Sequence, residues 1–375
     1  MEFIVSKREF VRGLARVQNV ADKKGTMPIL TNVLLSAEGT ALRLAATDLL
    51  LAVASTVGAD VRKPGSVALP ARSLFEMVKA LPDGDVTVLV GPNNSAKITG
   101  GRRRFEIVGM AGKDFPSLPS PGSSEMRDLP VDALIELIGL TSFSMSTDDT
   151  RPHLAGALLE NEDTALRMVT TDGHRLSKAE KTLTSSASSK LSLLIPAKGV
   201  HELKRLLDEA AAERRADEPS PAVAIGQSGS NVFFRREGTL MAIKLVEAEF
   251  PAYQQVIPSG GDRHAQMPRV TLLEALRAVS LVSSDRTSGV RMQFAPGKLT
   301  ISSENPDVGA GSDELDAKLD GEPLTVGFNA RYLIDVLSAL GDDDVMIDMA
   351  GELDPGVIRP AGHRGFLGVI MPMRI

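Results

Sequence analysis

Three short stretches of the sequence share one pattern, an apolar strand that ends in proline or asparagine and continues into Ala-Arg or Ala-Lys. They are Val67-Ala68-Leu69-Pro70-Ala71-Arg72, Leu193-Leu194-Ile195-Pro196-Ala197-Lys198 and Val326-Gly327-Phe328-Asn329-Ala330-Arg331. Pro70 and Pro196 are 126 positions apart, and Pro196 and Asn329 are 133 apart. Similar segments at a nearly constant step indicate an internal repeat. We therefore interpret the 375 residues as one unit of about 125 residues that occurs three times.

Two further markers keep the same order and step. The first consists of Thr47-Asp48, Thr171-Asp172 and Ser303-Glu304, and the second of Phe115-Pro116 and Phe250-Pro251. Stretches rich in Pro, Ser and Gly follow the second marker, at residues 116–124 and 258–262, and such composition is typical of linkers. The sequence thus predicts three domains, at residues 1–120, 128–253 and 258–375.

Each unit repeats one order of elements: a helix, alternating strands, the marker strand and a second helix. The first helix is expected to start at a capping box, Ser6 with Glu9 in the first unit and Thr271 with Glu274 in the third. This repeated order of elements predicts an α+β fold of three repeated domains, each with sheets and two helices. The middle unit is longer around residues 210–221, which we interpret as a helix extension that ends in a surface loop, with no function assigned.

The composition excludes several classes of protein. With no Cys, the chain has no disulfide framework, thiolate zinc site or cysteine nucleophile. The N-terminus lacks a signal-peptide pattern and no window has the apolar length of a membrane-spanning helix, so we expect a cytoplasmic protein. The charge of −6, from 42 basic and 48 acidic residues, by itself argues against a nucleic-acid binder.

The distribution of charge favours a different interpretation from the total. Basic residues lie opposite the apolar stripes of several predicted helices: Arg8, Arg12, Arg16, Arg72, Lys79, Lys198, Arg205, Arg277 and Arg331. An ordinary solvated helix face accounts for any one of them. Three units placed side by side would, however, align these faces into a basic surface that grips phosphates without reading sequence.

Catalytic and metal-binding motifs are not found in the sequence, and no metal or cofactor is expected. One cluster, Thr171-Asp172-Gly173-His174, places a carboxylate two positions from an imidazole. The matching place in the first unit, Thr47-Asp48-Leu49-Leu50, has no His. A strand-end turn therefore explains the cluster better, although a hydrolase using Asp172 and His174 stays an alternative.

The chain resembles the beta subunit of bacterial DNA polymerase III, the replicative sliding clamp, over its whole length. The residues that carry the resemblance are Met27-Pro28-Ile29-Leu30, Thr171-Asp172-Gly173-His174-Arg175-Leu176, Phe250-Pro251-Ala252-Tyr253, Gly327-Phe328-Asn329-Ala330-Arg331-Tyr332 and Val369-Ile370-Met371-Pro372-Met373-Arg374-Ile375. The family implies a non-enzymatic processivity factor, a head-to-tail homodimer closed into a ring of six domains, with helices lining a hole for duplex DNA. The dimer interface would then lie near Phe105 in the first unit and near Leu281 and Val282 in the third.

The resemblance also implies a cleft that binds short peptides from the polymerase III alpha subunit, the clamp loader, other polymerases and repair proteins. Its residues in this sequence would be Leu154, Thr171, Gly173, His174, Arg175, Leu176, Pro251, Val256, Asn329, Tyr332, Val369, Met371, Pro372, Met373 and Arg374. Aliphatic and Met side chains suit an adaptable apolar groove. Gln255 and Thr287 depart from the family pattern at its edge, so the preference among partners stays open.

DNA-facing residues are expected on the inner helices. The family pattern and the helix faces together indicate Lys24, Arg72, Lys79, Lys198 and Arg205, whereas Asp148 is left out. A peptide-binding scaffold of three repeats, unrelated to DNA, is the third alternative.

Overall fold

The computed structural model of the protein describes residues 1–21, 27–184, 190–215, 217–258, 260–284, 288–341, 343–362 and 365–374. Lys24 and Thr287, named above, lie outside these ranges. Contacts within the described residues divide the chain into two compact units. Unit 1 contains Met1–Asp132 and His201–Leu245, and unit 2 contains Ala133–Val200 and Val246–Ile375. The central third of the sequence is thus shared between the units.

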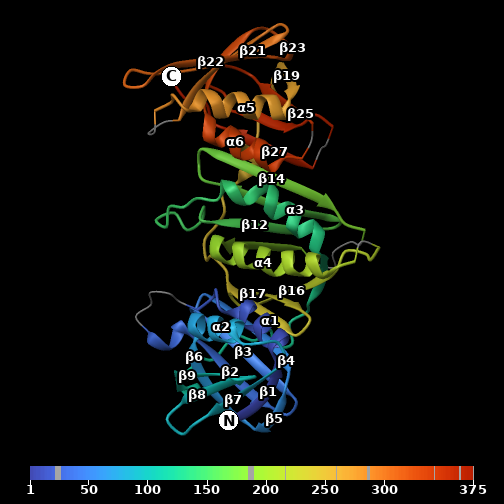
Figure 1. Ribbon diagram of the computed structural model, residues 1–375. Coiled ribbons are helices and arrows are strands. Elements are labelled where there is room, and N and C mark those ends of the chain that lie inside the picture. The colour runs from blue at the N-terminus through green and yellow to red at the C-terminus, as the bar shows by residue number, and fades with distance from the viewer. Residues whose placement is uncertain are drawn as a thin grey trace. The chain divides into compact units, whose positions relative to one another are not determined.

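Unit 1 holds two antiparallel sheets and the first two helices (Figure 1). The five-stranded sheet has the order β5-β1-β7-β8-β9, formed by Asp60–Lys63, Glu2–Ser6, Asp85–Val90, Ser95–Gly100 and Arg103–Val108. The nine-stranded sheet has the order β10-β6-β2-β3-β4-β18-β17-β16-β11, formed by Met110–Ala111, Gly65–Pro70, Asn32–Glu38, Ala41–Thr47, Leu51–Gly58, Thr239–Lys244, Asn231–Arg236, Ala222–Ser228 and Arg127–Pro130. Helices α1 (Lys7–Val17) and α2 (Ala71–Ala80) pack against each other, and α1 also packs on β3 and β4.

Unit 2 has the same plan. Its nine-stranded sheet has the order β15-β12-β13-β14-β27-β26-β25-β19-β23, formed by Leu191–Pro196, Gly156–Glu162, Ala165–Thr171, Arg175–Thr182, Phe366–Ile370, Gly356–Pro360, Asp344–Met349, Arg263–Pro268 and Lys318–Asp320. Its four-stranded sheet has the order β22-β21-β20-β24, formed by Gly309–Asp316, Lys298–Asn305, Gly289–Ala295 and Leu324–Asn329. Helices α5 (Arg269–Ser280) and α6 (Ala330–Ala339) pack against each other. The divisions between the units in the sequence, after Asp132 and after Val200, fall within helices α3 (Val131–Thr141) and α4 (Ala197–Glu213).

The marker stretches behave as the repeat predicts. Each forms a strand, β6, β15 or β24, and a helix starts at the next residue, Ala71, Ala197 or Ala330. Buried aliphatic residues of these strands, such as Leu69, Ile195 and Val326, belong to the core. The α+β fold predicted from the repeat is confirmed.

The predicted helix starts are correct in one case and wrong in another. The Ser6 side chain accepts a hydrogen bond from the Glu9 backbone N–H and caps α1. Helix α5 begins two residues before the expected Thr271, at Arg269, directly after Pro268. The Arg269 N–H donates to the Asp343 carbonyl at 2.8 Å, so one free donor of the first turn is satisfied by backbone and not by a side-chain cap. The extension of the middle repeat is confirmed, because α4 has 17 residues whereas α2 and α6 have 10 each.

Candidate functional site

A tight turn between β13 and β14 forms the centre of the candidate site in unit 2. The Thr171 Oγ1 donates to the Arg175 carbonyl at 2.6 Å and accepts from the Gly173 N–H at 3.1 Å. One oxygen of Asp172 accepts from the backbone N–H groups of His174 and Arg175, at 2.9 and 3.0 Å. Gly173 has φ +92°, a region that favours glycine. The carboxylate therefore holds the backbone of the turn and does not orient the His174 imidazole, which argues against the hydrolase alternative.

The same turn occurs in unit 1, where the repeat predicts it. Thr47 Oγ1 donates to the Leu51 carbonyl at 2.9 Å and accepts from the Leu49 N–H at 2.9 Å. Asp48 accepts from the N–H groups of Leu50 and Leu51. Because the hydrogen bonds match one for one, the Thr-Asp pair is a structural element of the repeat and not a catalytic one.

Arg175 joins this turn to the C-terminal part of unit 2. Its guanidinium donates to Asp172 Oδ2 at 3.1 Å, to Asp335 Oδ2 of α6 at 2.6 Å and to the Phe143 carbonyl at 2.5 Å. It also lies 4.5 Å from the centre of the Tyr332 ring, a cation–π contact. The Arg175 side chain is only 10% exposed, so its charge is balanced inside the site by two carboxylates.

The C-terminal strand closes the other side of the turn. Strand β27 pairs with β14, so Val369 lies opposite Leu176, and the Met371 N–H donates to the His174 carbonyl at 3.0 Å. The Met373 N–H donates to the Gly327 carbonyl of β24 at 2.7 Å. The last described residues thus connect both sheets of unit 2 beside the turn.

A buried apolar cluster adjoins the turn through Leu176 of β14 and Val369 of β27. Its buried members are Leu158, Val169, Leu176, Tyr253 and Val369, with Phe250, Ile257, Val357 and Leu367 packed against them. Val256, next to Ile257, is 46% exposed, and Met371, two positions after Val369, is 38% exposed. Partly exposed apolar side chains beside a buried apolar cluster are suited to contact with an apolar ligand group.

The structure brings together most of the residues predicted for the cleft. Leu154 is buried beside Gly173, and the side chain of Asn329 caps α6 one turn from Tyr332. Connectivity places Pro251 next to the Phe250–Tyr253 ring pair, and Pro372 and Arg374 next to Met371 and Met373. Gln255 is exposed in the short helix Tyr253–Gln255 beside Val256. Sequence reasoning missed Asp335 and Phe143, although a buried arginine requires such partners.

Two tyrosines of the site have pKa values above the ordinary value. Burial, followed by the charge of Asp172, raises the pKa of Tyr332 above its ordinary value. Burial and the hydrogen bond that its hydroxyl donates to Glu160 Oε2, at 2.8 Å, raise the pKa of Tyr253 to about 12.

The Tyr253 pKa predicts a loss of stability at high pH. The folded pKa lies above the unfolded value of about 10, so the folded state retains this proton more tightly. Its contribution is complete below pH 10 and is lost as the pH rises to 12, on the order of 1 kcal/mol. Urea unfolding of the wild type and of Tyr253→Phe at pH 8 to 12 measures the effect. A Tyr253→Phe curve as steep as the wild-type curve would contradict it.

The basic residues predicted to face DNA differ in their surroundings. Arg72 and Lys79 of α2 are exposed, as is Lys198 at the start of α4. Arg205 is half-buried, and its guanidinium donates to the carbonyls of Ala15 and Arg16 at 2.9 and 2.6 Å. Since these bonds direct the Arg205 side chain to the end of α1 within unit 1, we leave it out of the DNA-facing set.

The residues predicted for the dimer interface lie at accessible places. Phe105 is half-buried on β9, the outer strand of the five-stranded sheet. Leu281 follows α5 and is 81% exposed. Val282 contacts β22, where its Cγ2 would lie 2.9 Å from a Cβ added to Gly311. Within the described ranges, no group of three or more His, Asp or Glu side chains is placed to hold a metal ion.

Comparison with known proteins identifies the family. The family models for the N-terminal, central and C-terminal domains of the DNA polymerase III beta subunit match residues 1–119, 128–252 and 254–374. The chain belongs to the DNA polymerase III beta subunit family. The beta sliding clamps of Caulobacter vibrioides and Escherichia coli strain K12 are each 32% identical to it over the full length of both chains.

Solved structures agree with the family. The crystal structure of the DNA polymerase III subunit beta from Pseudomonas aeruginosa has 32% identity and a TM-score of 0.92, with both chains covered completely. The sliding clamp from Bartonella birtlesii, bound to griselimycin, has 34% identity and a TM-score of 0.92 over both complete chains. The predicted sliding-clamp function is thereby confirmed, as is its assignment as a non-catalytic subunit of DNA polymerase III. Among the helices of the described ranges, none is long and apolar enough to cross a membrane.

Proposed function

We propose that the protein acts in the cytoplasm as a head-to-tail homodimer that encircles duplex DNA and tethers the replicative polymerase. The observation that carries the proposal is the threefold repeat, which matches all three domain models of the family in order. We keep the division into domains 1–120, 128–253 and 258–375 as part of the proposal. Two copies then supply six domains for one ring, and a head-to-tail contact can close such a ring.

Two outer strands support the head-to-tail contact. Strand β9 is at the edge of its sheet in unit 1, and β22 is at the edge of its sheet in unit 2. Exposed backbone groups of such edges pair readily with another chain. Arg102, Arg103 and Arg104 are exposed in or beside β9, whereas Asp313, Glu314 and Asp316 are exposed on β22. Opposite charges on the two edges favour the pairing of unlike ends.

Exposed basic residues on helices support the encirclement of DNA. Arg72, Lys79 and Lys198 are exposed lysine or arginine residues on helices, as phosphate contacts require. The closed ring itself keeps the protein on the DNA. The phosphate contacts therefore need only be weak and independent of sequence. A net charge of −6 is compatible with this arrangement, because other acidic surfaces repel duplexes outside the ring.

The charge-dependent contact predicts a measurable change in salt dependence. Replacing Arg72, Lys79 and Lys198 together by Ala removes three phosphate contacts. The slope of log K against log salt for duplex binding is expected to fall by about 3. Fluorescence anisotropy over a salt series measures this slope. The control Lys63→Ala/Lys113→Ala/Lys318→Ala removes three exposed lysines, and equal slopes for both triple variants would refute the assignment.

We further propose that the surface around His174 binds short linear peptides of the polymerase III alpha subunit, the clamp loader, other polymerases and repair proteins. The exposed Val256 and Met371 would contact apolar peptide side chains, and the Gly173–His174 turn would contact the peptide backbone. Tethering raises the effective concentration of polymerase at the primer end.

Primer extension tests the function directly. With the polymerase and clamp loader of the same replication system and ATP, addition of the protein is expected to lengthen the products made in one polymerase-binding event. His174→Ala is expected to lose this effect while it is still retained on DNA. Product lengths that do not change on addition of wild-type protein would contradict the function, and a substrate-hydrolysing activity lost in His174→Ala would favour the hydrolase.

A further inference from the structure

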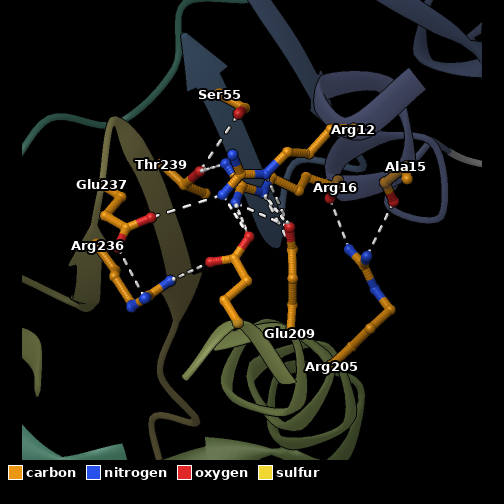
Figure 2. Close-up of polar contacts among 10 residues, drawn as sticks. Arg12, Ala15, Arg16, Ser55, Arg205, Glu209, Arg236, Glu237 and Thr239 are labelled. Atoms are coloured by element: carbon orange, nitrogen blue, oxygen red, sulfur yellow. Dashed lines mark hydrogen bonds and ion pairs between the residues drawn. The ribbon is translucent and has the colours of Figure 1, made fainter. Parts of the chain in front are cut away.

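A cluster of arginines and glutamates connects α1 to the far end of α4 within unit 1 (Figure 2). Arg12 and Arg16 come from α1, Glu209 and Glu213 from α4, and Arg236 and Glu237 from the hairpin between β17 and β18. Arg12 pairs with Glu213 and, at 3.5 Å, with Glu209, while Arg236 pairs with Glu213 at 3.3 Å. Segments nearly 200 residues apart in sequence thus share one ionic network.

Arg16 is the buried centre of this cluster. It is 5% exposed, and its Nε donates to both carboxylate oxygens of Glu209, at 2.9 and 3.0 Å. Its Nη1 donates to Thr239 Oγ1 at 3.2 Å, and Thr239 in turn contacts Ser55 Oγ at 3.3 Å. Glu209 is therefore the main counter-ion of a buried charge, an arrangement that is strongly destabilised when one partner is removed.

Arg205 makes the reciprocal contact. It lies one turn before Glu209 on α4 and donates to the carbonyls of Ala15 and Arg16, in the last turn of α1. Carbonyls at a helix C-terminus lack helical partners and attract cations. Each helix thus contributes an arginine that binds the other, Arg16 to Glu209 and Arg205 to the end of α1.

The cluster depends on the additional length of α4. Helices α2 and α6 have 10 residues, whereas α4 has 17, so Glu209 and Glu213 lie in the turns that the other repeats lack. Burial acts to lower the pKa of Arg12, but the charges of Glu213 and Glu209 outweigh it and raise this pKa above its ordinary value. The extension to which the sequence assigned no function therefore carries the anions that hold α1.

The sheet makes a second connection between the same segments. Strand β4 pairs with β18 from Ser55 opposite Thr239 to Leu51 opposite Ile243. Paired strands twist relative to one another over a range of angles, so this ladder alone leaves the angle between the segments adjustable. The contacts between α1 and α4 lie apart from this ladder of paired strands. They form a second attachment between the same two segments and restrict the angle.

We propose that the extended α4 is a latch in which Glu209 is the positioning residue that fixes Met1–Asp132 against His201–Leu245. This inference rests on the proposed function in one respect. A fixed angle between these two segments matters for function only if the chain closes into a ring. The latch itself is a property of one chain and can be tested without DNA or dimerisation.

A distance measurement between spin labels tests the latch. The chain contains no Cys, so Arg8→Cys and His201→Cys place labels at two exposed positions on α1 and α4 alone. Double electron–electron resonance of the full-length protein is expected to give one narrow distribution of the distance between the two labels. Glu209→Gln is expected to broaden that distribution at least about twofold or shift its mean, because Arg16 loses its carboxylate partner.

The matched control is Asp208→Asn on the same helix. Asp208 pairs only within α4, with Lys204 at 2.7 Å, among the contacts of the described residues. This variant is expected to keep the wild-type distribution. If Glu209→Gln does not fold, Arg205→Met/Glu202→Gln removes the reciprocal contact together with the carboxylate that pairs with Arg205 at 2.8 Å within α4, and it is expected to broaden the distribution. A wild-type distribution in every variant that folds would overturn the latch.

Ring closure is measured separately by sedimentation velocity. A working latch predicts that Glu209→Gln weakens dimerisation roughly tenfold, the size of a typical coupling between distant sites, although Glu209 is on α4 and not on β9 or β22. If the wild-type protein does not dimerise, the proposed ring is wrong while the label distances still decide on the latch. If dimerisation is unchanged although the distances broaden, the latch does not control ring closure, and that part of the inference fails.

Discussion

Replacing Arg175 by Met is expected to lower the free energy of unfolding by about 2–3 kcal/mol, because it leaves the largely buried Asp172 carboxylate without its cation. Arg175 holds Asp172 of the turn, Asp335 of α6 and the Phe143 carbonyl in one place. Without it, the turn loses its connection to α6, and the peptide-binding surface loses its shape. Affinity for a polymerase-derived peptide is therefore expected to fall by roughly 100-fold or more.

The control for Arg175 is Arg331→Met on α6. Arg331 is exposed and neighbours Tyr332, so the change removes the same side chain without disturbing a buried pair. Its effect on unfolding is expected to remain within about 0.5 kcal/mol. Urea denaturation and peptide titration by calorimetry measure both quantities. Equal stabilities of the two variants would show that Arg175 is not the connection we describe.

Replacing Leu281 by Asp is expected to weaken the homodimer by roughly 100-fold or more, the effect of losing an apolar anchor at an interface. Leu281 is 81% exposed in the single chain, the highest value among the exposed large apolar residues of the described ranges. In the proposed dimer, the carboxylate would be desolvated without a counter-ion. The dissociation constant is obtained from sedimentation velocity over a dilution series.

Leu353→Asp provides the comparison for Leu281. Leu353 is 65% exposed in the loop between β25 and β26, so the same substitution tests a leucine outside the proposed interface. Its dissociation constant is expected to equal that of the wild type. A Leu281→Asp protein that dimerises as tightly as Leu353→Asp would place the dimer contact elsewhere.

Local signals in the sequence were sufficient to predict the repeat and most of its elements. The marker strands, the Thr-Asp turns and the Ser6 cap depend on residues close in sequence, and the structure contains all of them. The longer α4 was predicted for the same reason. The Thr271 box was wrong because the helix starts earlier, at Arg269, whose N–H bonds to the carbonyl of the distant Asp343.

Contacts between distant segments could not be predicted from periodicity. Arg205 and Arg16 have the spacing of a solvated helix face, yet the two helices bind each other through them. Asp335 and Phe143 reach Arg175 from α6 and from the short helix Ser142–Ser144. The two compact units also differ from the three repeats, because β18 pairs with β4 and β27 pairs with β14 across repeat boundaries.

Retention on circular DNA tests the central claim most directly. Protein loaded on nicked circular DNA, with clamp loader and ATP, is separated from free protein by gel filtration before and after a single cut linearises the circle. A closed sliding ring predicts that the protein stays on the circle and is lost from the linear DNA by running off its ends. Protein that stays equally on both, or that is released equally from both, would contradict the encirclement of DNA.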